Sequence, residues 1–173
     1  METIKQSVEK TRFTILVRIM VIGILFFGAH SYLSAQVNPR ALGLRFGAGS
    51  VFGAEISYQH GLSDKNRFEA DLGFGASRDH NRFFVAGIYH WVWNLNDGLN
   101  WYIGPGAAAG FYSYDVLENY LNIGVGGQIG LEYDFNTLDA PFLLSIDVRP
   151  MWDFIGHGSG LGWGLSLGAR YTW

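Results

Sequence analysis

Hydrophobic and polar residues alternate along most of the chain after residue 40. At the C-terminal end, large apolar residues fill nearly every second position from Leu161 to Trp173, and small or polar residues fill the positions between them. A repeat of two residues is that of a β-strand, whose successive side chains point to opposite faces of a sheet. The contrast between the two sets predicts a sheet with a different environment on each face.

The same alternation recurs in segments that are separated by turn-forming residues. Asn96-Asp97-Gly98 is the strongest hairpin signal, because Asp-Gly supplies the positive φ of tight turns. No helical period competes, and no linker divides the chain. We predict eight strands, over residues 41–49, 54–60, 67–77, 83–95, 99–112, 120–135, 142–154 and 161–173.

Composition places this sheet in a membrane. Charged residues make up only 16% of the chain, against about 25% in a typical soluble domain. No stretch after residue 35 is apolar for long enough to form a membrane-spanning helix. An all-β chain of this kind predicts an eight-stranded antiparallel up-and-down transmembrane β-barrel, formed by residues 36–173.

The width of such a barrel decides which face is outside. The lumen of eight strands is only just wide enough for side chains to fill it. The bulky aromatic and aliphatic set would overfill it, so we expect that set outside, against lipid, and the glycines, small residues and charges inside. The alternative is a soluble, lipocalin-like barrel with its apolar face inward, which would leave a glycine-rich and charge-poor exterior in water.

Residues 1–35 have the pattern of a secretory signal peptide. A basic region precedes an apolar core over residues 19–29, which is too short to span a bilayer. Small Ala35 suits the position before a cut, so we expect cleavage between Ala35 and Gln36 and export to the outer membrane of a Gram-negative bacterium. An uncleaved anchor is the alternative, and Arg18 counts against it. The basic residues are Lys5, Lys10, Arg12 and Arg18.

Aromatic residues gather near one predicted turn and near the C-terminus. With an even number of strands and a periplasmic N-terminus, both places lie on the periplasmic side, where they would form part of an interfacial aromatic girdle. The girdle residues are Trp91, Trp93, Trp101, Tyr171 and Trp173.

Charged residues on the inward face are the candidate functional residues. Buried charges must pair or cost several kcal/mol each, so we expect an ion-pair network that plugs the lumen. A conduction path, or carboxylates that act as acid and base, is the alternative. We expect Arg149 to pair with Glu132 or Asp134 on a neighbouring strand. The predicted network is Arg45, Glu55, Arg67, Glu69, Asp71, Glu132, Asp134, Asp147, Arg149 and Arg170, and Asp153 also faces inward.

The chain resembles the small eight-stranded outer-membrane β-barrel proteins, the OmpA/OmpX-like group, and most of all the short barrel proteins of the Bacteroidetes. The resemblance lies in the end of the signal peptide at residues 33–36, the strand at 143–150 and the terminal segment 162–173. It implies that the last strand, with its terminal Trp173, is recognised by the barrel-assembly machinery, and that outer-membrane lipid surrounds the protein. We expect a monomer, because a closed barrel has no free sheet edge.

The resemblance to this group leaves several functions open. We favour a non-enzymatic integral outer-membrane protein with a structural or surface-interaction role. A small pore or transport-associated barrel is the second possibility. The third is a lipid A-modifying enzyme, since His157 and Ser159 have the spacing of a His-x-Ser pair and Asp153 is near in sequence. These two residues lie in a predicted glycine-rich turn, so we assign no catalytic residue.

Cofactors, metals and nucleic acid have no support in the sequence. The chain contains no cysteine, which excludes thiolate metal sites and cysteine nucleophiles. Its formal net charge is −3, without the clustered basic residues that nucleic-acid binding needs. Gly104-x-Gly106 and Gly124-x-Gly126 do not open a helix after a strand, so they are not nucleotide-binding fingerprints.

Overall fold

The alternating segments form antiparallel strands. The structure is a computed structural model, and it describes residues 37–49, 53–76, 80–114, 120–154 and 160–173. No helix in these ranges is long and apolar enough to cross a membrane. The elements are β1 (Arg40–Gly49), β2 (Gly53–Ser63), β3 (Asn66–Ala76), β4 (His80–Asn96), β5 (Leu99–Tyr114), β6 (Tyr120–Asp134), the 3₁₀-helix η1 (Phe135–Leu138), β7 (Phe142–Val148), β8 (Met151–Asp153), β9 (Gly160–Gly162) and β10 (Gly164–Thr172).

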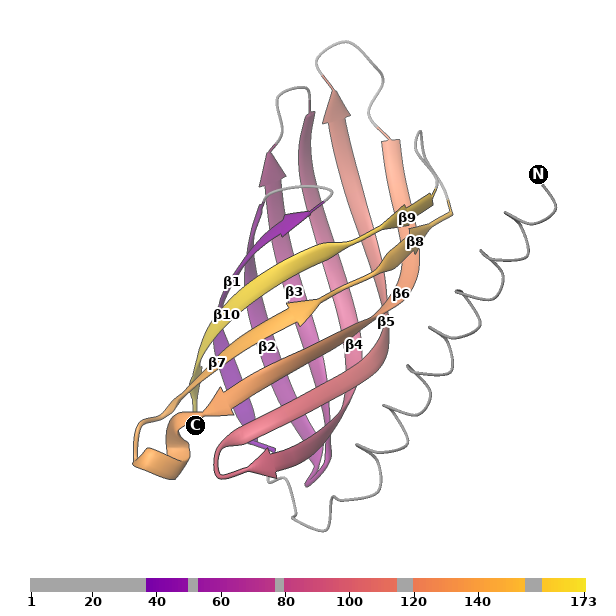
Figure 1. Ribbon diagram of the computed structural model, residues 1–173. Coiled ribbons are helices and arrows are strands. Elements are labelled where there is room, and N and C mark those ends of the chain that lie inside the picture. The colour runs from indigo at the N-terminus through magenta and orange to yellow at the C-terminus, as the bar shows by residue number, and fades with distance from the viewer. Residues whose placement is uncertain (1–36, 50–52, 77–79, 115–119, 155–159) are drawn as a thin grey trace, which may run out of the picture. The chain divides into compact units, whose positions relative to one another are not determined.

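The sheet closes on itself (Figure 1). β1 pairs with β2 and also with β10, where Ala41 lies opposite Thr172. β7 and β8 are two parts of one barrel strand, because Val148 opposite Ile129 and Met151 opposite Gly126 keep one register on β6. β9 and β10 likewise continue one another across Trp163. The ten segments therefore make the eight-stranded antiparallel barrel that the sequence predicts.

Pro150 explains why the seventh predicted strand is divided. It lies between β7 and β8, opposite Gly127, and proline has no N–H to donate to the ladder. The carbonyl of Pro150 still accepts a hydrogen bond from the Gly127 amide at 3.1 Å. The strand therefore continues past Pro150 with one ladder donor fewer.

The two ends of the barrel differ. The lower end in Figure 1 holds the β2–β3 turn, the β4–β5 turn, η1 and the C-terminus. Gly98 has a φ of 75° in the β4–β5 turn, as the Asp-Gly signal predicts. β2 runs to Ser63, beyond the predicted end at residue 60, because a bulge between Gly61 and Ser63 lets pairing continue into residues that otherwise favour a turn.

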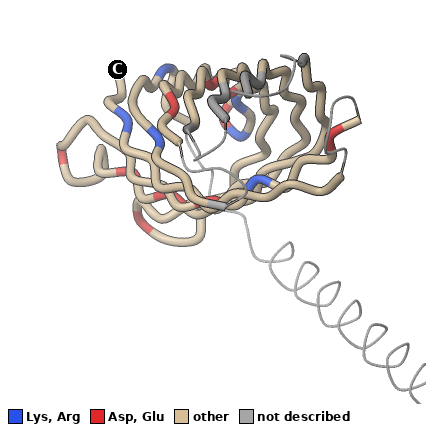
Figure 2. Tube along the Cα trace, turned by 90° about the horizontal axis from the view of Figure 1, so that it is seen from above, with Lys and Arg blue, Asp and Glu red and all other residues tan. Residues whose placement is uncertain are grey.

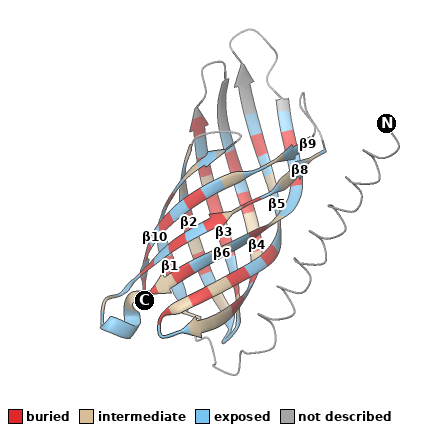
Figure 3. Cartoon of the chain, viewed as in Figure 1, coloured by how far each residue is buried: buried red, intermediate tan, exposed pale blue. Residues whose placement is uncertain are grey.

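The two faces of the sheet are separated as the sequence predicts. Along β10 the exposed and buried positions alternate, and the same stripes run across the other strands (Figure 3). On the outer face Leu144 is 45% exposed and Phe111 is 61% exposed, whereas Arg45 and Glu69 are fully buried inside. The soluble alternative, with the apolar face inward, is therefore wrong.

The lumen also contains large apolar side chains, which the sequence analysis did not expect. Phe84, Ile88 and Tyr102 are buried in it. Glycines on neighbouring strands make room for two of them: a Cβ atom on Gly73 would lie 2.2 Å from the Phe84 ring, and one on Gly130 would lie 2.6 Å from the Tyr102 ring. The expectation of a lumen filled by small and charged residues was wrong. A large side chain that lies against a glycine on the next strand also fills the space.

Candidate functional site: the charged lumen

Arg45 stands at the centre of the lumen. Its guanidinium donates hydrogen bonds to the carboxylates of Glu55 on β2 and Asp147 on β7, and to Asp71 Oδ2 on β3 at 3.2 Å. Its Nε lies 3.9 Å from Glu69 Oε1. Because Arg45 itself comes from β1, one fully buried side chain ties strands from different parts of the barrel wall together.

Arg149, between β7 and β8, joins the same carboxylates from the other side. Its Nη2 pairs with Asp71, its Nη1 donates to Glu55 Oε2 at 3.1 Å, and its Nε donates to Gln128 Oε1 at 3.0 Å. The expectation that Arg149 pairs with Glu132 or Asp134 was wrong. The inward curvature of the barrel brings Arg149 to carboxylates across the lumen, on strands that are not its neighbours.

Arg170 on β10 and Glu69 on β3 complete the group. Arg170 Nη2 lies 3.1 Å from Glu69 Oε2, and Glu69 also accepts hydrogen bonds from the amides of Gln59 and Gln128 at 2.6 and 3.2 Å. The hydroxyls of Ser57 and Ser145 accept the other two Arg170 hydrogen bonds. We call the connected set the central charge network: Arg45, Arg149, Arg170, Glu55, Glu69, Asp71 and Asp147.

The central charge network is almost balanced. Three arginines face four carboxylates, which gives a formal charge of −1. In the view from above, the charged positions lie on strands around the wall (Figure 2). Each guanidinium makes several charge-assisted hydrogen bonds, which is how buried ions offset the cost of leaving water.

A second buried group lies beside the central charge network. Arg67 Nη1 contacts Glu132 Oε2 at 2.7 Å, and Arg67 Nε donates to His90 Nδ1 at 3.3 Å. The guanidinium also lies over the Tyr102 ring, 4.7 Å from its centroid, in a cation–π contact. The Tyr102 hydroxyl donates to Asp147 Oδ2 at 3.1 Å, so the two groups are linked.

Asp134 does not join the ion pairs. It lies at the lower end of the barrel, where its carboxylate accepts hydrogen bonds from the Asn38 side chain at 2.8 Å and from the Asn136 backbone N–H at 2.9 Å. It is the N-cap of η1. Within the described residues Asp134 makes no ion pair, and its contacts are those of a helix cap.

No protein-family model and no curated protein matches this chain. Solved structures match over 78% of the chain. Neisserial surface protein A aligns with a TM-score of 0.58 at 18% identity over 95% of its own chain, and the N-terminal β-barrel domain of OprF from Pseudomonas aeruginosa aligns with 0.61 at 17% over 96%. Ail, the attachment invasion locus protein of Yersinia pestis, aligns with 0.50 at 12% over 96%.

The chain has the fold of the small eight-stranded outer-membrane β-barrels. The resemblance read from the sequence is confirmed at this level. At 12–18% identity the likeness shows a shared fold and does not show a shared function.

The aromatic residues predicted to form a girdle lie toward the lower end of the barrel. Trp93 and Trp101 are opposite each other on β4 and β5 and stack with ring centroids 4.5 Å apart. Tyr171 and Trp173 stack at 6.1 Å beside the C-terminus. Trp91 is 42% exposed on the outer face. Four further aromatic residues make similar contacts, although they were not predicted as part of the girdle. Tyr89 packs against Trp91, and Phe135 packs against Tyr133 and Phe142. Their outward positions and the adjacent turns would have suggested them.

Two further groups of residues bear on the site. His157 and Ser159, the pair considered for a lipid-modifying enzyme, lie outside the described residues, and so does the predicted signal peptide. The neutral partners of the lumen arginines and carboxylates were missed because they carry no charge, although they share the inward period of the charged residues. These partners are Ser57, Gln59, His90, Tyr102, Gln128 and Ser145.

Proposed function

We propose that this protein is an integral outer-membrane barrel of a Gram-negative bacterium with a structural or surface-interaction role, and that its lumen is closed. The observation that carries the proposal is the inverted distribution of polarity. Apolar side chains such as Leu144, Phe111 and Leu167 cover the outer face, and the ionic groups are buried inside. Only a hydrocarbon environment makes such an exterior stable, because water would contact almost every large apolar residue.

The central charge network supports the closed lumen. Arg45, Arg170, Glu69 and Asp71 are each at most 1% exposed, so water reaches almost none of their surface. An ion that moved through the lumen would have to separate arginine–carboxylate pairs that are buried and hydrogen-bonded, which costs several kcal/mol for each pair.

The fold neighbours support the surface role. One is a surface protein of Neisseria and another is an attachment invasion locus protein of Yersinia pestis, so this barrel fold serves at cell surfaces. A fold hosts many functions, and this proposal therefore needs its own test on the chain.

Membrane integration is tested first, with the purified mature chain folded in detergent. We expect a β-rich circular dichroism spectrum and a heat-dependent shift in gel migration. A protein that stays soluble without detergent would contradict the proposal. In planar bilayers we expect no conductance above that of the protein-free membrane, and a stable channel would instead establish a pore.

Orientation is tested with single cysteines, because the chain has none of its own. Phe154→Cys places a thiol just after β8, toward the upper end of the barrel, and Asp97→Cys places one in the β4–β5 turn at the lower end. We expect a membrane-impermeant maleimide to label Phe154→Cys on intact cells and Asp97→Cys only after the outer membrane is opened. The reverse labelling would contradict a periplasmic lower end.

A further inference from the structure

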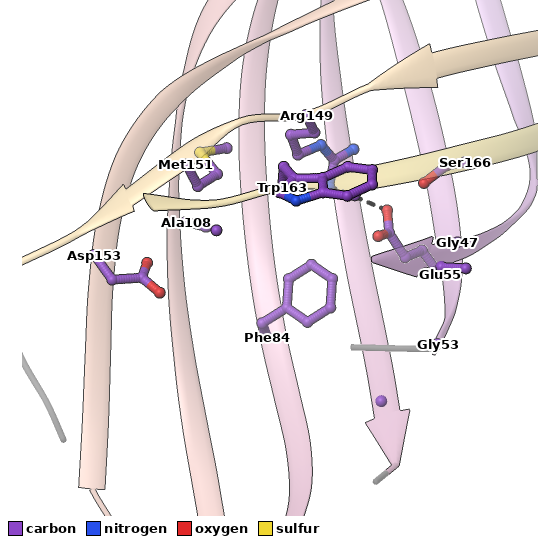
Figure 4. Close-up of a pocket in the computed structure, with 14 residues that line it drawn as sticks. Gly47, Gly53, Glu55, Phe84, Ala108, Arg149, Met151, Asp153, Trp163 and Ser166 are labelled. Carbon is purple, nitrogen blue, oxygen red and sulfur yellow. Dashed lines mark hydrogen bonds and ion pairs between the residues drawn. The ribbon is translucent and has the colours of Figure 1, made fainter. Parts of the chain in front are cut away.

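A cavity of about 120 Å³ lies between the central charge network and the upper end of the barrel. Small residues from several strands line it, and they leave space that larger side chains would fill. Phe84, Met151 and Trp163 add apolar surface, and Glu55 and Arg149 lie at its border with the network (Figure 4). The volume is close to that of a cavity of about 150 Å³ that holds benzene in another protein, so it suits a ligand of a few heavy atoms.

Asp153 gives this cavity a charge that no described side chain neutralises. Its side chain is half-buried, lines the cavity from β8, and has no hydrogen bond or ion pair with any residue that the structure describes. In Figure 4, Asp153 and Glu55 lie on opposite sides of the Phe84 ring. Counted over the described side chains, Asp153 and the −1 of the central charge network make this part of the lumen formally negative, and a negative cavity with low-dielectric walls attracts cations.

The cavity does not suit an anion. Arg149 is the only cationic residue in the described lining, and each of its guanidinium nitrogens already has a partner: Nε contacts Gln128, Nη1 contacts Glu55, and Nη2 contacts Asp71. A bound anion would have to break one of these contacts and would also lie near Asp153.

A hard metal ion is also unsuited to the described lining. Ca²⁺ takes six to eight oxygen ligands, and Mg²⁺ requires an octahedron. The described lining offers side-chain oxygens from Asp153, Glu55 and Ser166 only, and Glu55 Oε2 is already shared between Arg45 and Arg149. The apolar surface of Phe84, Met151 and Trp163 would have no role around a small hydrated ion.

We propose that this cavity binds a small organic ammonium ion, whose nitrogen pairs with the Asp153 carboxylate and whose apolar part lies against Phe84 and Met151. This site goes beyond the structural or surface role, but it rests on the closed lumen proposed above, because the central charge network forms the floor.

The test is calorimetric titration of the detergent-folded mature chain with n-butylammonium as the probe. n-Butanol and butyrate are the matched neutral and anionic probes of the same size. We expect n-butylammonium alone to bind. Binding of n-butanol or butyrate as strong as that of n-butylammonium, or no binding of n-butylammonium, would overturn the proposal.

Matched variants locate the site. Asp153→Asn keeps the shape and removes the charge, and we expect the Kd to rise about tenfold, as for the loss of one charge-assisted hydrogen bond. Asp97→Asn removes the same charge at the lower end and should leave the Kd unchanged. Gly164→Leu should block binding by filling the cavity, since a Cβ atom there meets no atom closer than 3.9 Å. An unchanged Kd in both Asp153→Asn and Gly164→Leu would overturn the proposal.

Two controls separate a loss of ligand binding from a loss of folding and from an open lumen. The heat-dependent gel shift shows whether each variant is folded. The conductance of the wild-type chain tests the closed lumen independently. A protein that conducts ions and also binds n-butylammonium would contradict the proposal that the central charge network closes the cavity, but it would leave the proposed ligand class intact.

Discussion

Removing the charge of Arg45 tests whether the central charge network stabilises the barrel. We consider Arg45→Met, which keeps an unbranched side chain of similar length. Arg45 is fully buried and donates hydrogen bonds to Glu55, Asp71 and Asp147. In the variant, Glu55 and Asp71 keep Arg149 as a partner, but within the described part of the chain Asp147 keeps only the Tyr102 hydroxyl, at 3.1 Å.

The expected cost follows from this arrangement. The formal charge of the central charge network falls from −1 to −2, and one carboxylate loses its cation. Breaking a buried ion pair by removing one partner costs about 3–5 kcal/mol. With a denaturant dependence of about 1–3 kcal/mol per molar urea, we expect the unfolding midpoint to fall by at least about 1 M.

The assay is urea unfolding in lipid vesicles, followed by the gel shift and by tryptophan fluorescence. Arg40→Met is the matched control, because Arg40 is exposed at the start of the same strand and should contribute less than about 0.5 kcal/mol. In the double variant Arg45→Met/Asp147→Asn we expect a smaller loss than the sum of the two single losses, because the unpaired charge is gone. If Arg45→Met is no less stable than Arg40→Met, the network does not hold the barrel together.

Three further predictions concern the wall and the end of the barrel. Gly43→Ala should fail to give the folded gel band, because its Cβ atom would lie 1.9 Å from the Ala169 carbonyl oxygen. Gly164→Ala is the control and should fold normally, since its Cβ atom would meet no atom closer than 3.9 Å. Equal folding of the two variants would contradict the close approach of β1 and β10 at Gly43. Leu167→Arg on the outer face should lower the free energy of unfolding in vesicles by about 2–4 kcal/mol and Leu138→Arg in η1 by about 0–1 kcal/mol, and similar losses would argue against a bilayer around β10. Trp173→Ala should lower the amount of folded protein in the outer membrane of cells but leave refolding in detergent unchanged; unchanged cellular levels would argue against a role of Trp173 in assembly.

The sequence by itself determined the strands and their two faces. Alternation places Leu144 on one face and Asp147 on the other wherever the strand lies in space, because the side-chain period of a strand is two residues. The size of the apolar side chains then determined which face is outside, because they would overfill the narrow lumen. Turn chemistry placed the β4–β5 hairpin at Gly98, because few residues other than glycine adopt a positive φ.

Only the tertiary structure decided which charges meet. Arg149 pairs with Asp71 and Glu55, and these residues lie on strands that are not its neighbours in the sheet. Their meeting depends on the stagger of the strands and on closure of the barrel through β1 and β10, and neither leaves a mark in local sequence. The same closure separates Asp134 from the ion pairs and leaves Asp153 without a partner in the described chain. A repeat of two residues records the face of each side chain, but the contacts across a closed lumen are set by the three-dimensional path of all the strands together.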